Sequence, residues 1–255
     1  MTKKKLENWL VWIGVDVLYV RHVHLQASVR HRGIVRSLPR ARGAGPHRLA
    51  ALDGGVRKCA ASRGLTTAVS NRPFRVTVTG PESTGKTTLA QRLAESLGTE
   101  WVPEASRVYA ERVARELTSS DVEPIAREHI ALADAAVERV RAREGKVLVL
   151  DTDLVSTIVY ARHYYALSSE WLEREERARR ADLSLLCDVD VPWISDGIRD
   201  RPTNRDAMFA QFRDALESRA AHTIVIRGDW ESRWTSARDA VVQLLASERE
   251  PRSHR

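Results

Sequence analysis

The stretch that decides the fold reads Gly80-Pro81-Glu82-Ser83-Thr84-Gly85-Lys86-Thr87-Thr88, and it directly follows the apolar run 74–79. Residues 80–87 fit the pattern G-x-x-x-x-G-K-[S/T], in which a glycine-rich turn joins a strand to a helix. Two glycines allow the backbone to curl so that successive N–H groups point inward at an anion. The helix that follows adds the positive end of its dipole. This stretch therefore predicts a loop that binds the phosphates of a nucleoside triphosphate.

The polar residues of this loop each have an expected part in binding. Lys86 is expected to bring a positive charge to the β- and γ-phosphates, as both a nucleotide-binding and a catalytic residue. Thr87 is expected to offer its hydroxyl to Mg²⁺. The remaining residues expected to contact the nucleotide are Gly80, Glu82, Ser83, Thr84, Gly85 and Thr88. ATP and Mg²⁺ are the predicted cofactors.

The net charge of +7 is unevenly distributed along the 255 residues. Residues 1–72 contain 14 Lys and Arg against 3 Asp and Glu, which leaves 27 basic and 31 acidic residues in the remainder. The region around the phosphate-binding loop is therefore mildly acidic. For this reason the basic pI does not indicate that this region binds DNA or RNA, and no nucleic-acid partner is predicted.

The first 72 residues are predicted to be a basic, disordered N-terminal extension. They are rich in arginine and show little hydrophobic periodicity. A translation start assigned too far upstream explains the same composition, and a targeting segment is a third, weaker alternative. The apolar run 9–20 is interrupted by Asp16 and is too short to span a bilayer. We therefore expect no membrane partner and a cytoplasmic location.

Strand and helix signals alternate from residue 73 onward, which predicts a parallel sheet. Strands are expected at 74–79, 100–102, 147–150, 183–187 and 223–226. The predicted fold is α/β: a three-layer P-loop NTPase of the nucleoside/nucleotide-kinase kind, with a five-stranded parallel sheet flanked by helices, in a kinase domain at 73–250. One expected helix carries Tyr109, Val113 and Leu117 on a single face, and the charged run 170–180 is expected to be a solvated helix. Cys187 lies in an apolar run and is expected to be a buried free thiol.

Acidic residues follow two of the predicted strands. Asp151 comes directly after the apolar strand 147–150 and is expected to hold Mg²⁺ together with Thr87. Glu104 follows the second strand and could accept the proton of an attacking hydroxyl. Asp153 could serve the same hydroxyl, or it could cap the next helix. Arg107 could pair with a phosphate or with Glu104.

The segment 192–205 follows the fourth strand and combines arginines with Gly, Pro and Asn, a composition typical of a mobile lid. Phosphoryl transfer spreads negative charge over the γ-phosphoryl oxygens, and lid arginines can neutralise it. Arg199 is therefore a predicted catalytic residue, and Arg201 and Arg205 are predicted to bind the nucleotide.

Together these motifs resemble the ribosylnicotinamide kinase domain of NadR-type proteins over about residues 73–247. The resemblance rests on the loop at 80–89, on Trp-Val-Pro-Glu at 101–104 with Arg107 and Tyr109, on Asp-Thr-Asp at 151–153, and on Pro192-Trp193 with Asp-Gly-Ile-Arg at 196–199. It implies ATP with Mg²⁺ as the donor and the 5′-hydroxyl of nicotinamide riboside, a small-molecule nucleoside, as the acceptor. It also implies a substrate site formed by Glu104, Arg107, Tyr109, Asp153 and Trp193.

This resemblance leaves out one domain of the family. Members that also make the dinucleotide carry an adenylyltransferase domain before the kinase, marked by His-x-Gly-His, and residues 1–72 do not match it. Stand-alone relatives can use other acceptors, so a kinase of another nucleoside or nucleotide is the first alternative. A nucleotide-dependent switch or ATP-binding module without kinase activity is the second. A guanine-specific switch would need Asn-Lys-x-Asp after a late strand, and Asn204-Arg205-Asp206 does not fit it.

Overall fold

The computed structural model describes residues 72–192 and 204–247, which lie in the compact unit Ser70–Arg255. The strands are β1 (Phe74–Thr79), β2 (Trp101–Val102), β3 (Val147–Asp151), β4 (Leu183–Cys187) and β5 (Thr223–Ile226). The helices are α2 (Lys86–Leu97), α3 (Ala105–Val113), the 3₁₀ turn η1 (Ser119–Asp121), α4 (Val122–Ala142), α5 (Leu154–Tyr165), α6 (Glu170–Arg179), α7 (Arg205–Glu217) and α8 (Trp230–Ser247).

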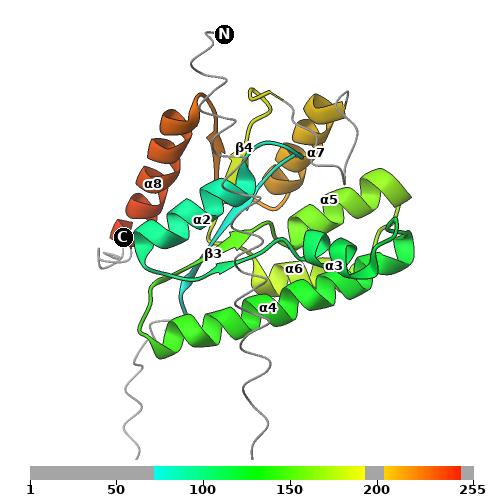
Figure 1. Ribbon diagram of the computed structural model, residues 1–255, viewed down its shortest axis with the longest axis horizontal. Helices are drawn as coiled ribbons and strands as arrows, with labels where there is room; N and C mark the ends of the chain where they lie inside the picture. The colour runs from blue at the N-terminus through cyan, green and yellow to red at the C-terminus, as the bar shows by residue number, and fades with distance from the viewer. Residues whose placement is uncertain (1–71, 193–203, 248–255) are drawn as a thin grey trace, which may run out of the picture. The chain divides into compact units, whose positions relative to one another are not determined.

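The five strands form one parallel sheet in the order β2-β3-β1-β4-β5 (Figure 1). The central strand β1 pairs with β3 on one side and with β4 on the other. The chain order therefore reverses next to β1, and in such sheets ligands bind beyond the carboxyl ends of the strands at this point. The glycine-rich loop that leaves β1 lies at this position.

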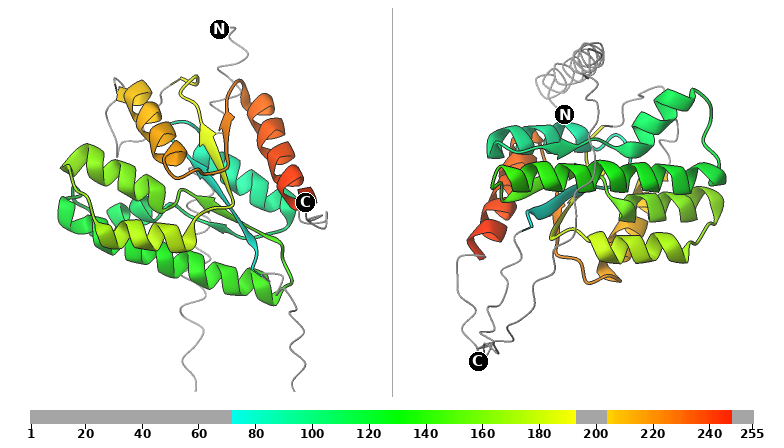
Figure 2. Two further views of the ribbon diagram at one scale, coloured as in Figure 1. Left: turned by 180° about the vertical axis from the view of Figure 1, so that it is seen from behind. Right: turned by 90° about the horizontal axis from the view of Figure 1, so that it is seen from below.

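Helices cover both faces of the sheet, as the views in Figure 2 show. Alternate residues of β1, β3 and β4 pack on α2 and α8, in a core that includes Val76, Val149, Leu89 and Val241. The opposite residues of the strands face α4, α5 and α7. The predicted α/β fold with three layers and a five-stranded parallel sheet is therefore confirmed.

Most predicted strands agree with the structure in position. The expected bounds of β1, β4 and β5 are the observed ones, and β3 extends by one residue to include Asp151. The helix α2 begins at Lys86 and ends at Leu97, and Gly98 follows it in the left-handed conformation. That conformation costs glycine little, which explains the stop at this position. Cys187 is a buried free thiol, as expected.

Two expectations for the helices were wrong. The helix that carries Tyr109 ends at Val113, because Ala114 adopts a left-handed conformation (φ 51°), so Leu117 is not part of its face. The charged run 170–180 does form a helix, α6, but one of its carboxylates is not solvated. Glu176 is only 2% exposed, and it accepts two hydrogen bonds from Arg180.

Several sequence predictions lie outside the described residues. These are the N-terminal extension except for Arg72, most of the predicted lid, and the end of the chain beyond residue 247. Among the helices of the described ranges, none is both long and apolar enough to cross a bilayer.

Candidate nucleotide-binding site

The glycine-rich loop has a backbone that its sequence requires. Gly80 has φ 131°, and a Cβ atom at this position would lie 2.7 Å from the backbone oxygen of Cys187 in β4. Gly85 has φ 79° and stands immediately before α2. Both glycines therefore occupy conformations that disfavour other residues, and Gly80 also needs the close approach to β4. Ser83, between them, has φ 53°.

Lys86 lies over this loop at the first turn of α2. Its Nζ donates a 2.7 Å hydrogen bond to the backbone oxygen of Pro81, and the Thr84 hydroxyl donates to the same oxygen at 2.8 Å. The Lys86 side chain is almost fully buried. The cation is therefore held against the backbone of the loop, where a lysine of this motif can reach the phosphates of a nucleotide.

Thr87 and Asp151 lie next to each other although 64 positions separate them in the chain. The Thr87 hydroxyl donates a 2.6 Å hydrogen bond to Oδ2 of Asp151, the last residue of β3. Asp151 is 1% exposed, and its other carboxylate oxygen, Oδ1, is buried without a hydrogen-bond partner. Burial, and then the charge of Glu104, raise the pKa of Asp151 to about 6.

This pair fits a magnesium ion. A hydroxyl and a carboxylate with an unsatisfied oxygen are the hard oxygen donors that Mg²⁺ prefers, and Mg²⁺ commonly takes its other ligands from water and substrate phosphates. A cation would also stabilise the buried negative charge of Asp151, which the protein itself leaves only partly compensated. The structure thus brings the two predicted metal-binding residues together.

Glu104 lies at the start of α3, after the short strand β2. Its carboxylate is 5% exposed and accepts a 2.6 Å hydrogen bond from the Ser106 hydroxyl. Arg107 forms an ion pair with it at 3.8 Å. The charge of Glu104 contributes to the raised pKa of Asp151, so the two carboxylates lie within electrostatic range of each other. Because α3 begins beyond the carboxyl end of β2, Glu104 and Arg107 lie at the edge of the sheet where a ligand is expected.

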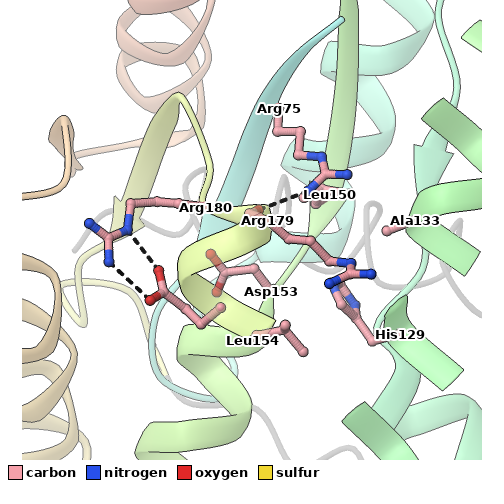
Figure 3. Close-up of a pocket in the computed structure, with 9 residues that line it drawn as sticks. Arg75, His129, Ala133, Leu150, Asp153, Leu154, Arg179 and Arg180 are labelled. Carbon is pink, nitrogen blue, oxygen red and sulfur yellow. Dashed lines mark hydrogen bonds and ion pairs between the residues drawn. The ribbon is translucent and has the colours of Figure 1, made fainter. Parts of the chain in front are cut away.

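Asp153 faces a different part of the molecule. It caps α5 by accepting a hydrogen bond from the Ser156 backbone N–H, and burial raises its pKa to about 6. Asp153 lines a small cavity together with Arg75, His129 and Glu176, and Figure 3 shows how Asp153, Arg75 and His129 lie around it. None of residues 80–88 lines that cavity. Of the two roles considered for Asp153, the structure shows the helix cap.

Three further predicted residues have protein partners in the structure. The Tyr109 hydroxyl donates to the buried carboxylate of Asp121 at 3.0 Å. Glu82, near the tip of the loop, accepts a 3.3 Å hydrogen bond from Tyr164 of α5. Arg205 is the first residue of α7 rather than part of a lid, and it donates to the backbone oxygens of Val191 and Ser83. Trp193, Arg199 and Arg201 lie outside the described residues.

Sequence reasoning missed one residue of this region, Arg233 of α8. It is 1% exposed and donates to the backbone oxygen of Thr84 at 3.2 Å. A signal was available in the sequence: Arg233 precedes Trp234 and lies four positions before Ala237 on the stripe of α8 that packs on the sheet. A charged residue on an apolar helix face needs buried partners, so its presence there indicates a buried polar contact.

The loop between β1 and α2, the lysine over it and the Thr87–Asp151 pair, set in this strand order, define a P-loop nucleotide-binding domain. Comparison with known proteins specifies the family. A family model described as an AAA domain matches residues 75–233, and the chain belongs to that family.

Two NadR proteins are among the similar proteins. The chain is 28% identical over 192 residues to the trifunctional NAD biosynthesis/regulator protein NadR of Escherichia coli (strain K12), a match that covers 70% of this chain and 45% of that protein. The NadR of Salmonella typhimurium is 27% identical over 191 residues, with 69% and 45% covered. This chain thus matches less than half of the length of either relative.

Solved structures of NadR show the same likeness in three dimensions. A crystal structure of NadR protein in complex with NR superposes with a TM-score of 0.56 at 26% identity, covering 71% of this chain and 52% of that one. A second, in complex with NAD and AMP-PNP, gives a TM-score of 0.55 at 26% identity, with the same coverage.

Proposed function

We propose that this protein is an ATP- and Mg²⁺-dependent kinase that transfers the γ-phosphoryl group to a hydroxyl of a small nucleoside. The observation that carries the proposal is the contact between Thr87 and Asp151, next in the chain to Lys86 of the loop, with the buried Glu104 carboxylate within electrostatic range of Asp151. A phosphate-binding loop, a metal-binding pair and a carboxylate for the acceptor are the parts that phosphoryl transfer to a hydroxyl requires. The similarity to NadR supports the same assignment.

The donor side is assigned to the loop and the end of β3. Lys86 and the loop amides hold the β- and γ-phosphates, and Thr87 and Asp151 hold Mg²⁺. The metal, when bound, neutralises negative charge on the phosphate oxygens. Lys86 is already positioned by its bond to Pro81, so little side-chain entropy remains to be lost when a nucleotide binds.

The acceptor side is assigned to Glu104. In the reaction the bond between the γ-phosphorus and the β–γ bridging oxygen breaks, and a bond between that phosphorus and the acceptor oxygen forms. The acceptor hydroxyl loses its proton to the Glu104 carboxylate, which Ser106 holds in place. Asp153 is the weaker candidate for this role, because its carboxylate caps α5 and lies in a cavity that the loop does not reach.

The acceptor that we favour is the 5′-hydroxyl of nicotinamide riboside. The motifs that resemble NadR-type kinases and the match to a NadR structure in complex with NR support this choice. Arg107 and Tyr109, which follow Glu104 on α3, and Trp193 would contact the nucleoside. Arg199 and Arg201 would approach the phosphates from the lid, while Arg205 supports the loop backbone at Ser83.

The test is ADP release by the full chain with ATP and Mg²⁺ and a panel of nucleosides that includes nicotinamide riboside. We expect strong stimulation by nicotinamide riboside and none in Lys86→Ala. The matched control is Lys146→Ala, since Lys146 is exposed and lies before β3, at the opposite edge of the sheet.

Other results would change the proposal in defined ways. Stimulation by a different nucleoside would keep the kinase and replace the acceptor. Slow ATP hydrolysis that no nucleoside stimulates would contradict the kinase and support the nucleotide-dependent switch. Equal activity of Lys86→Ala and the native chain would refute the site itself.

A further inference from the structure

Arg233 connects the P-loop to the ends of two strands. Its guanidinium donates to the backbone oxygens of Thr84 at 3.2 Å, Gly228 at 3.0 Å and Asp188 at 2.9 Å, and it forms an ion pair with the Asp190 carboxylate. Thr84 belongs to the loop after β1, Asp188 follows β4, and Gly228 follows β5. A single buried side chain thus joins three segments that are distant in sequence.

The contact with Thr84 has a consequence for the anion-binding face of the loop. In a trans peptide the C=O and the following N–H point in nearly opposite directions. The C=O of Thr84 is directed at Arg233, on the side of β4 and α8. The N–H of Gly85, which belongs to the same peptide unit, is therefore directed away from Arg233.

A second arginine makes the equivalent contact one peptide earlier. Arg205 of α7 donates to the backbone oxygen of Ser83 at 3.4 Å and to that of Val191 at 2.9 Å. By the same geometry, the N–H of Thr84 is directed away from Arg205. The carbonyl oxygens of two successive peptide units thus accept hydrogen bonds from arginines outside the loop. The Arg233 contact is the shorter of the two, and Arg233 is the more deeply buried residue.

We propose that Arg233 is a positioning residue of the nucleotide site: it holds the Thr84–Gly85 peptide in the orientation that presents the Gly85 amide to the phosphates. It acts through the loop backbone and does not itself contact the nucleotide. A peptide turned the other way would direct a carbonyl dipole at the triphosphate, and like charges repel there. The expected effect of Arg233 on nucleotide binding rests on the proposed function. Its expected effect on the conformation of the loop does not.

Arginine suits this position better than other residues. Its rigid fork carries five donors, and here it reaches three carbonyl oxygens and a carboxylate at once. Lysine would keep the charge and the partner Asp190 but would offer a single ammonium group. Replacement of Arg233 by lysine therefore separates the geometry of the contacts from the charge.

The experiment compares the full-length native chain with Arg233→Lys and Arg233→Met. Val241→Ala is the control for stability, since Val241 is buried on the same helix as part of the hydrophobic core. Three quantities are measured: the Kd of ATP with Mg²⁺ by calorimetry, the midpoint of urea unfolding, and the rate of amide hydrogen exchange at Thr84 and Gly85. The exchange is measured without nucleotide.

We expect both Arg233 variants to bind ATP about tenfold to a hundredfold more weakly, the scale of one lost charge-assisted hydrogen bond. The backbone amides of Thr84 and Gly85 should exchange faster in the Arg233 variants than in Val241→Ala. Each variant is compared at the same interval of urea concentration below its own unfolding midpoint. The Kd of Val241→Ala should stay within twofold of the native value. If Arg233→Met does not fold, Arg233→Lys gives the same comparison.

Two outcomes would overturn the inference. One is an ATP affinity of Arg233→Lys within twofold of the native chain together with unchanged exchange at the loop. The other is a loss of affinity in Val241→Ala that matches the loss in the Arg233 variants, because the effect would then follow global stability. If the native chain binds no ATP, the proposed function fails, and the exchange rates alone decide whether Arg233 positions the loop.

Discussion

The hydroxyl of Thr87 lies 2.6 Å from Oδ2 of Asp151 and donates a hydrogen bond to it, which joins the start of α2 to the end of β3. The contact depends on the sheet order, because β3 is the neighbour of β1 and the loop that leaves β1 leads into α2. Oδ1 of the same carboxylate is buried without a hydrogen-bond partner. The pair is therefore suited to binding a cation. Without a cation, the buried, partly unsatisfied carboxylate lowers the stability of the folded state.

Replacement of Asp151 should separate activity from stability. Asp151→Asn removes a buried negative charge, so we expect the free energy of unfolding, measured in EDTA, to stay equal or rise. The same change should lower kcat/KM for ATP by about a hundredfold or more, since metal-ion stabilisation is worth several kcal/mol. Asp239→Asn, at an exposed site on α8, is the control. A variant that keeps native activity would show that Asp151 does not hold the metal.

Glu104 and Asp153 can be distinguished by isosteric amides. Glu104→Gln should lower kcat by about 10²–10⁴, the usual contribution of a general base, while the Kd of ATP stays unchanged. Asp153→Asn should keep kcat within a few-fold, because asparagine is also a good helix cap. Single-turnover phosphoryl transfer and ATP calorimetry are the measurements. The reverse pattern would move the base to Asp153.

Gly80 should tolerate no side chain. In Gly80→Ala the new Cβ would lie 2.7 Å from the Cys187 backbone oxygen, at a φ of +131° that alanine rarely adopts. Gly98→Ala is the matched control, since Gly98 has φ +60° and nothing within 4 Å of its Cβ position. We expect Gly98→Ala to lose roughly 1–2 kcal/mol in urea unfolding, and Gly80→Ala roughly 1–3 kcal/mol more, from the clash. Equal losses would show that β4 moves aside freely.

His129 of α4 should make the protein sensitive to acid. Burial, and then the charge of Arg75, lower its pKa to about 4 in the folded state, against 6.5 ordinarily. Between these values the unfolded chain binds the proton and the folded chain does not. The free energy of unfolding should therefore decrease as the pH is lowered from about 6.5 to about 4. This group contributes up to about 1.4 kcal/mol per pH unit to the decrease. The charged groups around it are Arg75, Asp134, Asp153, Glu176, Arg179 and Arg180.

The measurement for His129 is urea unfolding at several values between pH 7 and pH 4. His129→Gln should lose less stability over this interval than the native chain does. His222→Gln, at an exposed position, should follow the native chain. If His129→Gln and His222→Gln show the same pH dependence, the buried imidazole does not cause it.

Local patterns predicted most of the frame of this domain. Mainly apolar runs of four to six residues located four of the five strands, and the glycine-rich loop located the start of α2 to the residue. Asp151 was found because a residue that directly follows a central strand must lie at the carboxyl edge of the sheet. Such signals depend on neighbours in the chain, so they can be read without knowledge of the packing.

Other features could not be predicted because they depend on contacts between distant segments. Glu176 was expected in solvent with the rest of its helix, and it is buried because Arg180 and Arg219 lie against it. Asp153 had two open roles, and in the structure it caps α5 and lines a small cavity together with residues of α4 and α6. A charged residue can be buried only where partners are supplied, and those partners are arranged by the fold.

By itself the sequence determined the α/β class, the phosphate-binding loop, and the residue types that meet at the strand ends. Their backbone conformations and helix starts follow from local steric and hydrogen-bonding preferences. Only the tertiary structure showed that Asp153 lines a cavity apart from the loop, and which arginines contact the loop backbone. Arg233 and Thr84 are 149 positions apart in the chain. They meet because β4 lies beside β1, β5 lies beside β4, and α8 packs back on the same face of the sheet as α2, an arrangement set by packing over the whole domain.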